Sequence, residues 1–210
     1  MKILSIKHYA LSIKHYALSI KHYALSIKHY ALSIVLLCCA CEADNQYSSA
    51  TCNFVFQASL FPTSALTRAV SGAGGDFCIV KAVMEKGVYH LKLTPNQGSF
   101  SQTDLDLAIS NAVGNSNSNY VRMGRKRGLV IGRTYSGVLC AYDLQCPNCD
   151  FNSELHWADN PQELKCEKCK RIYNIYSEYS TVKGAEGRAL EQYKRVTYYP
   201  DRGILSVQNP

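Results

Sequence analysis

Beyond residue 50, short runs of alternating apolar and polar residues are separated by clusters of turn residues. Residues 52–58, 77–83 and 88–93 are rich in aromatic and β-branched side chains, and Glu85-Lys86-Gly87 separates the last two runs. Alternation of this kind, bounded by glycine, proline or asparagine, is typical of β-strands that bury one face. We therefore predict three strands here, of which the last two form a hairpin.

The second half of the chain repeats this pattern. Apolar or alternating runs lie at residues 128–132, 138–143, 171–176, 190–199 and 204–207. Residues 104–113 fit either a strand or the start of a short helix, because Thr103 and Asp106 can begin one. Short strands with a turn about every eight to twelve residues are typical of sandwiches and barrels. We predict an all-β fold, a small antiparallel β-barrel or sandwich, for residues 52–210.

The first forty residues differ from the rest. The heptapeptide Leu-Ser-Ile-Lys-His-Tyr-Ala starts at Leu4 and occurs four times in register, and an apolar run extends from Ala31 to Ala40. A seven-residue repeat can form a coiled coil, but identical repeats indicate duplication, because packing constrains only some heptad positions. A basic start followed by an apolar run too short to cross a bilayer is typical of a secretory signal. We predict an export leader at residues 1–41 and a polar linker at residues 42–51.

The end of the leader resembles a bacterial lipoprotein signal. Ala40 precedes Cys41, and the polar stretch Glu42-Ala43-Asp44-Asn45-Gln46 follows. In that signal the cysteine after the cleavage point is acylated, so we expect Cys41 to carry a lipid, with a plain secretory signal as the alternative. Either way, we expect the mature chain outside the cytoplasm, in the cell envelope. Acyl chains would add a membrane tether of about 0.8 kcal/mol per buried methylene.

Charge argues against nucleic acid as a partner. The formal net charge is +7, but the first forty residues hold five lysines and no acidic residue, which leaves 18 basic against 16 acidic residues in the remainder. The basic run from Arg122 to Arg127 has no interleaved aromatic residue and is typical of a solvated loop. The sequence also lacks a nucleophile elbow, a phosphate-binding glycine loop and a zinc-protease helix motif, so we expect a non-enzyme.

The strongest chemical signal is a pair of Cys-x-x-Cys motifs. Cys146-Pro147-Asn148-Cys149 is followed, after sixteen residues, by Cys166-Glu167-Lys168-Cys169. Two such pairs can bring four thiolates to one tetrahedral point, the geometry in which zinc and iron take four sulfurs. The proline suits a tight turn that points both sulfurs of its pair to one side. We predict that these four cysteines form a metal site built from two loops.

The features around the cysteines resemble the Rieske iron–sulfur domain over about residues 125–208. Ala141-Tyr142-Asp143 leads into the first pair, an aromatic residue follows the second pair at Tyr173, and Leu190, Tyr193 and the segment Gly203-Ile204-Leu205-Ser206-Val207 complete the order. The family reads Cys-x-His, about sixteen residues, Cys-x-x-His, and then an aromatic strand and a terminal hairpin. The chain also resembles Rieske-like lipoproteins of Bacteroides-type bacteria, which share the leader, the Ala-Tyr-Asp-Leu-x-Cys-Pro run and the Cys-x-x-Cys boxes. The resemblance implies a Rieske-like fold with its site in two loops.

The ligands depart from that family. Cys146 and Cys166 occupy its two cysteine positions, but Asn148 and Cys169 stand where it has histidines, and His156 is out of register. Two histidines on one iron give a Rieske centre its raised potential. We therefore expect structural zinc. A four-cysteine [2Fe–2S] cluster for electron transfer and a metal-free, disulfide-bonded site are the alternatives, the latter because exported cysteines meet oxidising conditions.

The remaining candidates are fewer. Cys140 lies in an apolar run and is expected to be a core residue, whereas Cys52 and Cys78 could form a disulfide with each other. His156 and Trp157 could cover the site or face a partner, and we favour a packing role for Trp157. With no catalytic motif found, we expect a domain that docks with an unidentified envelope protein.

Overall fold

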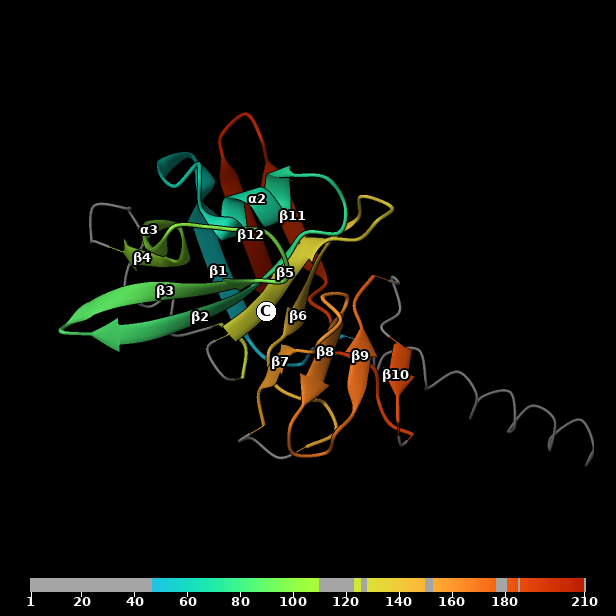
Figure 1. Cartoon of the computed structure of the whole chain (residues 1–210). Coiled ribbons are helices and arrows are strands. Elements are labelled where there is room, and N and C mark those ends of the chain that lie inside the picture. The colour runs from blue at the N-terminus through green and yellow to red at the C-terminus, as the bar shows by residue number, and fades with distance from the viewer. Residues whose placement is uncertain are drawn as a thin grey trace, which may run out of the picture. The chain divides into compact units, whose positions relative to one another are not determined.

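The computed structural model describes residues 47–109, 123–125, 128–149, 153–176, 181–184 and 186–209 (Figure 1). The predicted leader and its lipidation candidate Cys41 lie outside these residues. The described residues are mostly antiparallel strands in three sheets, which confirms the all-β class. The strand order in the described part leaves each sheet open, so the barrel variant of the prediction is not what these strands form.

The largest sheet has five strands in the order β4-β3-β2-β5-β6. Its strands are β2 (Phe77–Glu85), β3 (Val88–Pro95), β4 (Asp106–Ile109), β5 (Gly128–Arg133) and β6 (Leu139–Asp143). The predicted hairpin is present, because Glu85 pairs with Val88 and the two turn residues Lys86 and Gly87 both have positive φ. Two-residue turns with positive φ at both positions match the twist of the strands that they join.

Both faces of this sheet are covered. On one face, Val80, Leu129 and Ile131 pack against helix α2 (Ala65–Ser71) and against a three-stranded sheet of order β1-β12-β11. The bounds of that sheet are β1 (Cys52–Gln57), β11 (Arg195–Tyr199) and β12 (Ile204–Asn209). On the other face, Ile79 and Val130 belong to a second core. Strand β5 is therefore apolar at successive positions, as expected for a strand that is buried on both sides.

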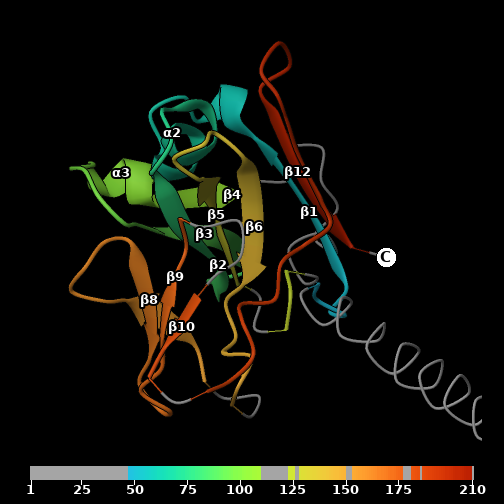
Figure 2. The ribbon, with the colours of Figure 1, turned by 90° about the vertical axis from the view of Figure 1, so that its right-hand side faces the viewer.

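The second core is shared with a small four-stranded sheet of order β10-β9-β8-β7. Its strands are β7 (Leu155–Trp157), β8 (Glu163–Cys166), β9 (Ile172–Asn174) and β10 (Thr181–Lys183). Figure 2 shows β8, β9 and β10 on one side of β6, with β1 and β12 on the other. The four cysteines of the predicted site lie in the loop before β7 and in β8 with the turn after it.

Some elements differ from the sequence prediction. Residues 102–109 contain both of the predicted alternatives: a short helix α3 (Gln102–Leu105), capped by a reciprocal bond between Ser101 and Asp104, and then strand β4. Helix α2 was not predicted, nor was the short helix η1 (Ala58–Leu60). The run at 190–199 is a regular strand only from Arg195, because the preceding residues bond to β6 instead: Tyr193 N–H donates to Ala141 O at 2.9 Å.

Residues 47–51, the described part of the expected linker, contact the strands. The backbone N–H of Ser48 donates to Gln192 O at 2.8 Å, and its hydroxyl donates to Glu191 Oε2 at 3.1 Å. Within the described residues, no helix has the length and apolar character needed to traverse a bilayer.

Candidate metal centre

The first cysteine pair lies directly after β6, and Asp143 fixes the point where that strand ends. This buried carboxylate accepts hydrogen bonds from Gln145 N–H at 2.8 Å and from the Tyr193 hydroxyl at 2.7 Å. The loop then closes on itself, because Cys146 N–H donates to Ser153 O at 2.9 Å. The turn from Cys146 to Cys149 is a local structure set by its proline and short spacing, as the sequence predicts.

The second pair begins in the last residue of β8 and continues into a tight turn. Lys170 N–H donates to Cys166 O at 2.8 Å, and Cys166 N–H donates to Arg171 O at 3.0 Å. Lys170 has a φ of 60°, in the left-handed region that only a minority of non-glycine residues adopt. This conformation reverses the chain after Cys169, so that both sulfurs of the pair can face the first loop.

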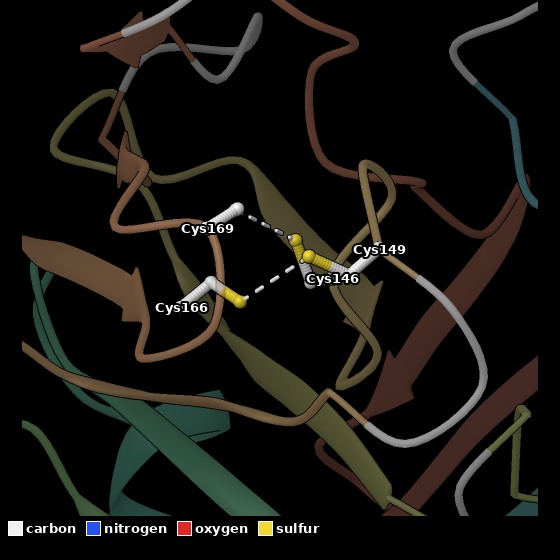
Figure 3. A group of neighbouring side chains, drawn as sticks. All are labelled: Cys146, Cys149, Cys166 and Cys169. Carbon is white, nitrogen blue, oxygen red and sulfur yellow. Dashed lines mark hydrogen bonds between the residues drawn. The ribbon is translucent and has the colours of Figure 1, made fainter.

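The four sulfurs meet between these two loops (Figure 3). Cys146 Sγ lies 3.7 Å from Cys169 Sγ, and Cys149 Sγ lies 3.8 Å from Cys166 Sγ. The ligand atoms of all four cysteines lie within 4.8 Å of one another. Cys146 and Cys166 are buried, whereas Cys149 and Cys169 are half-buried. The predicted residues are therefore brought together, and each close contact joins one loop to the other.

The sulfur spacing fits a single metal ion. A tetrahedral ion with metal–sulfur bonds of about 2.3 Å holds its sulfurs about 3.8 Å apart, since a tetrahedron's edge is about 1.6 times its centre-to-corner distance. Both measured contacts agree with this value. Four cysteines in this arrangement can hold a metal ion.

The same distances bear on the disulfide alternative. A disulfide joins two sulfurs at about 2.05 Å, which is far shorter than either contact. The seven cysteines of the described residues are all free thiols, including Cys52 and Cys78, which could have bonded to each other on the sequence evidence alone. Cys140 is buried in the second core, in the role expected for it.

A hydrogen-bond chain supports Cys146 from behind. The Tyr173 hydroxyl lies 3.2 Å from Cys146 Sγ. Asn148 Nδ2 donates to this hydroxyl at 3.0 Å, and Asn148 Oδ1 accepts from Arg188 N–H at 2.8 Å. Because the amide donates to the tyrosine oxygen, the hydroxyl proton is available for the sulfur. Asn148, at the position where the resembling family has a histidine, thus serves the site through Tyr173.

The thiols have unequal acidity. Burial raises the pKa of Cys146, and the hydrogen bond from Tyr173 offsets only part of this effect. Burial, followed by hydrogen bonds to Cys169 and Cys166, raises the pKa of Cys149. Burial also opposes ionisation of Cys169, but hydrogen bonds from the backbone and guanidinium of Arg171, together with those from Cys149 and Cys166, outweigh it and lower its pKa to about 6. Cys169 is therefore ready to bind a cation at neutral pH, whereas Cys146 and Cys149 lose their protons as the ion binds.

A second group of potential ligands lies on the five-stranded sheet. Glu85, His90 and Asp106 bring their ligand atoms together. The ammonium of Lys92 lies among them, 2.9 Å from Glu85 Oε1 and in hydrogen-bond contact with Asp106. This lysine already supplies the positive charge that these carboxylates attract. His156 is exposed on β7 and is not part of either group.

Sequence reasoning found the four cysteines but missed the residues that support them. In the sequence, Tyr173 stands out only as an aromatic strand residue, and Asn148 only as the residue where the resembling family has a histidine. Arg171, which bonds to Cys169, gave a signal that could have been used, because a basic residue two positions after a ligand offsets thiolate charge. The contact of Asn148 with Arg188 spans forty positions, so no local pattern reveals it.

Comparisons with known proteins add no assignment. No family model matches the chain, and neither the search of curated proteins nor the search of solved structures found a match. The conclusion at this stage is a small all-β protein with a cluster of four cysteines that can hold a metal ion.

Proposed function

We propose that Cys146, Cys149, Cys166 and Cys169 bind one zinc ion whose role is structural. The observation that carries this proposal is the sulfur geometry, with contacts of 3.7 and 3.8 Å between the loops and all four sulfurs within 4.8 Å. Zinc has no redox chemistry and is held in structural sites by four tetrahedral protein ligands, whereas catalytic zinc keeps one position open. Four cysteines leave no open position for a substrate.

A [2Fe–2S] cluster is the competing occupant, and it fits the distances less well. In such a cluster, two irons and two sulfides separate the cysteine pairs, so sulfurs on different irons stand farther apart than sulfurs on one ion. The two close contacts fit a cluster only if Cys146 shares one iron with Cys169 and Cys149 shares the other with Cys166, which places the remaining sulfur pairs across the cluster. All four ligand atoms lie within 4.8 Å of one another, so these remaining pairs are close as well, and this favours a single ion.

The location of the site favours a structural role. The sheet β7–β10 consists of strands of three or four residues, and strands this short form little backbone pairing of their own. Cys146 and Cys166 belong to the same buried cluster as Leu155, Leu164 and Tyr173. A metal ion at this point would join the loop before β7 to the end of β8, and its binding energy would be folding energy.

The metal content of the protein tests this proposal. Residues 45–210, the unit that contains every described residue, would be produced without oxygen in medium that supplies both zinc and iron. We expect a colourless protein with one zinc per chain. A brown protein with iron and acid-labile sulfide would replace zinc with a cluster, and a red protein with one iron and no sulfide would replace it with a single iron. Metal-free protein without free thiols would leave only disulfides.

The second part of the proposal concerns the location of the protein in the cell. We infer from the leader that the chain is exported and that Cys41 anchors it to a membrane, where its Rieske-like domain docks with another envelope protein rather than transferring electrons. The support is the leader's sequence and the absence of histidines from the ligand set. A Cys41→Ser variant is expected to leave the membrane fraction for the soluble fraction, with Cys39→Ser as the control. Membrane retention of Cys41→Ser would refute this choice of anchor.

A further inference from the structure

A cavity of about 340 Å³ opens between the small sheet β7–β10 and the five-stranded sheet. Strand β2 contributes Ile79 and Lys81 to its wall, and β7 with the residue before it contributes Glu154, Leu155, His156 and Trp157. Ligand sites often lie where two structural units meet, and volumes of about 300–1,000 Å³ are typical of them. None of these residues takes part in the four-cysteine site.

The indole of Trp157 and an ion pair in the wall are held in place by contacts between the two sheets. Trp157 Nε1 donates to Thr94 O at 2.9 Å, which fixes the indole of β7 against β3. Lys81 Nζ lies 2.6 Å from Glu154 Oε2, so an ion pair joins β2 to the residue before β7. Both side chains of this pair are partly exposed, at 39% and 29%. The cavity is thus preformed, and its charged groups remain accessible to a ligand.

The ion pair restricts the charge of an occupant. An anion that approached Lys81 would meet the carboxylate of Glu154 beside it, and a cation that approached Glu154 would meet the ammonium. A zwitterion would have to separate the pair before binding to each half. A neutral hydroxyl group can accept from the ammonium or donate to the carboxylate while the pair stays intact, because a hydroxyl is both donor and acceptor.

The apolar part of the cavity wall restricts the shape of an occupant. Ile79, Leu144 and Leu155 are buried, and Trp157 lines the cavity with its ring nitrogen already bonded. An occupant therefore needs an apolar face to lie against these side chains and hydroxyl groups to reach the ion pair. We propose that this cavity binds a neutral ring compound with several hydroxyl groups, namely a single pyranose sugar residue, with Lys81 and Glu154 bonded to its hydroxyls and Trp157 packed on its ring.

The fluorescence of Trp157 provides a direct test, because it is the only tryptophan in the chain. The protein, purified as the cell produces it in a polyoxyethylene detergent that contains no sugar, would be titrated with methyl β-glucopyranoside, methyl β-galactopyranoside and N-acetylglucosamine. Acetate, leucine and glycerol serve as an anion, a zwitterion and a polyol without a ring. We expect a saturable change in emission with at least one pyranose, with a Kd of about 0.1–10 mM, and none with the other three. The absence of a saturable response to all three sugars, or an equal response to acetate, leucine or glycerol, would overturn the proposal.

Two variants separate binding at the cavity from binding elsewhere. Lys81→Met and Glu154→Gln are each expected to weaken the pyranose about 10-fold or more, the effect of losing a charge-assisted hydrogen bond. Lys92→Met is the control, because Lys92 lies on the same sheet and in ion pairs of its own but does not line the cavity. Circular dichroism and calorimetry would verify folding and binding independently of the fluorescence. Equal affinity of all three variants for the sugar would overturn the assignment, whatever metal the cysteines hold.

Discussion

The two cores of this protein are built by different means. The first core joins α2, the three-stranded sheet and one face of the five-stranded sheet through large apolar side chains such as Phe54, Leu66 and Leu91. The second core is smaller, includes the ligands Cys146 and Cys166, and lies against strands of only three or four residues. From this comparison we expect that apolar burial sustains the first region alone, whereas the second region depends on the proposed metal cross-link between its loops.

Removing one of the four candidate ligands is the most direct test of whether the second region depends on a metal. We expect Cys166→Ser to lose the metal and to expose the amides of β7–β10 to hydrogen exchange, while β2, β3 and β5 keep most of their protection. The loss of folding free energy should exceed that of any single core substitution, because structural zinc supplies about 10–16 kcal/mol in zinc-finger peptides.

Cys140→Ser is the matched control for this experiment. Cys140 is also a buried cysteine of the second core but is not one of the four grouped ligands. The Cys140→Ser variant should retain the metal. Its free energy of unfolding should fall by only about 1–3 kcal/mol, the cost of burying a poorly bonded hydroxyl. If exchange in β7–β10 were the same for both variants, a structural metal would be ruled out.

A substitution in the first core should lower the free energy of unfolding without releasing the metal. Leu129 is completely buried on β5, and Leu129→Ala is expected to cost about 2–5 kcal/mol in the free energy of unfolding. Metal content per folded chain should not change, because the Leu129 side chain belongs to the first core. Denaturant unfolding and metal analysis would measure both quantities, with the exposed Val138→Ala as control. Loss of metal from a folded Leu129→Ala protein would contradict the independence of the two cores.

A smaller effect should come from the hydroxyl that supports the site. Tyr173→Phe removes the donor to Cys146 Sγ and leaves Asn148 without one of its acceptors. We expect metal transfer to a colorimetric chelator to be about 10-fold faster, in line with the loss of outer-shell bonds at other metal sites. Tyr198→Phe, on β11 beside the first core, should transfer its metal at the parent rate. Identical rates for the two variants would remove Tyr173 from the support of the site.

The smallest expected effect is the pH dependence of the stability that the Asp106 carboxylate contributes. The hydrogen bond from Lys92, helped by His90, lowers the pKa of Asp106 below its ordinary value of 3.8. The ionised carboxylate therefore adds stability that is present above pH 3.8 and is lost as the pH falls through the lowered pKa. Asp106→Asn should speed amide exchange in β3 and β4 at neutral pH, and the difference from the parent should disappear in stronger acid. A difference that persists there would show that packing, not charge, is responsible.

Much of the first region could be predicted from local sequence, because β1, β3 and β12 alternate between buried and more exposed residues and the hairpin turn carries Lys86-Gly87. Helix α2 was not predicted, since its seven residues carry no long periodic pattern and its start depends on one bond, from Thr67 N–H to Ser64 Oγ. In the small sheet, β7, β8 and β10 were also missed. Strands of three or four residues are too short for alternation to be recognised.

The sequence by itself determined the four candidate ligands, because the spacing within each Cys-x-x-Cys pair favours a local turn that brings its two sulfurs together. Only the tertiary structure decided which sulfurs meet across the loops, that Asn148 and Tyr173 support Cys146, and that Lys81 and Glu154 border a cavity. These contacts join residues 17 to 73 positions apart. Their partners are chosen by how the sheets pack, and packing is a property of the whole fold rather than of any local pattern.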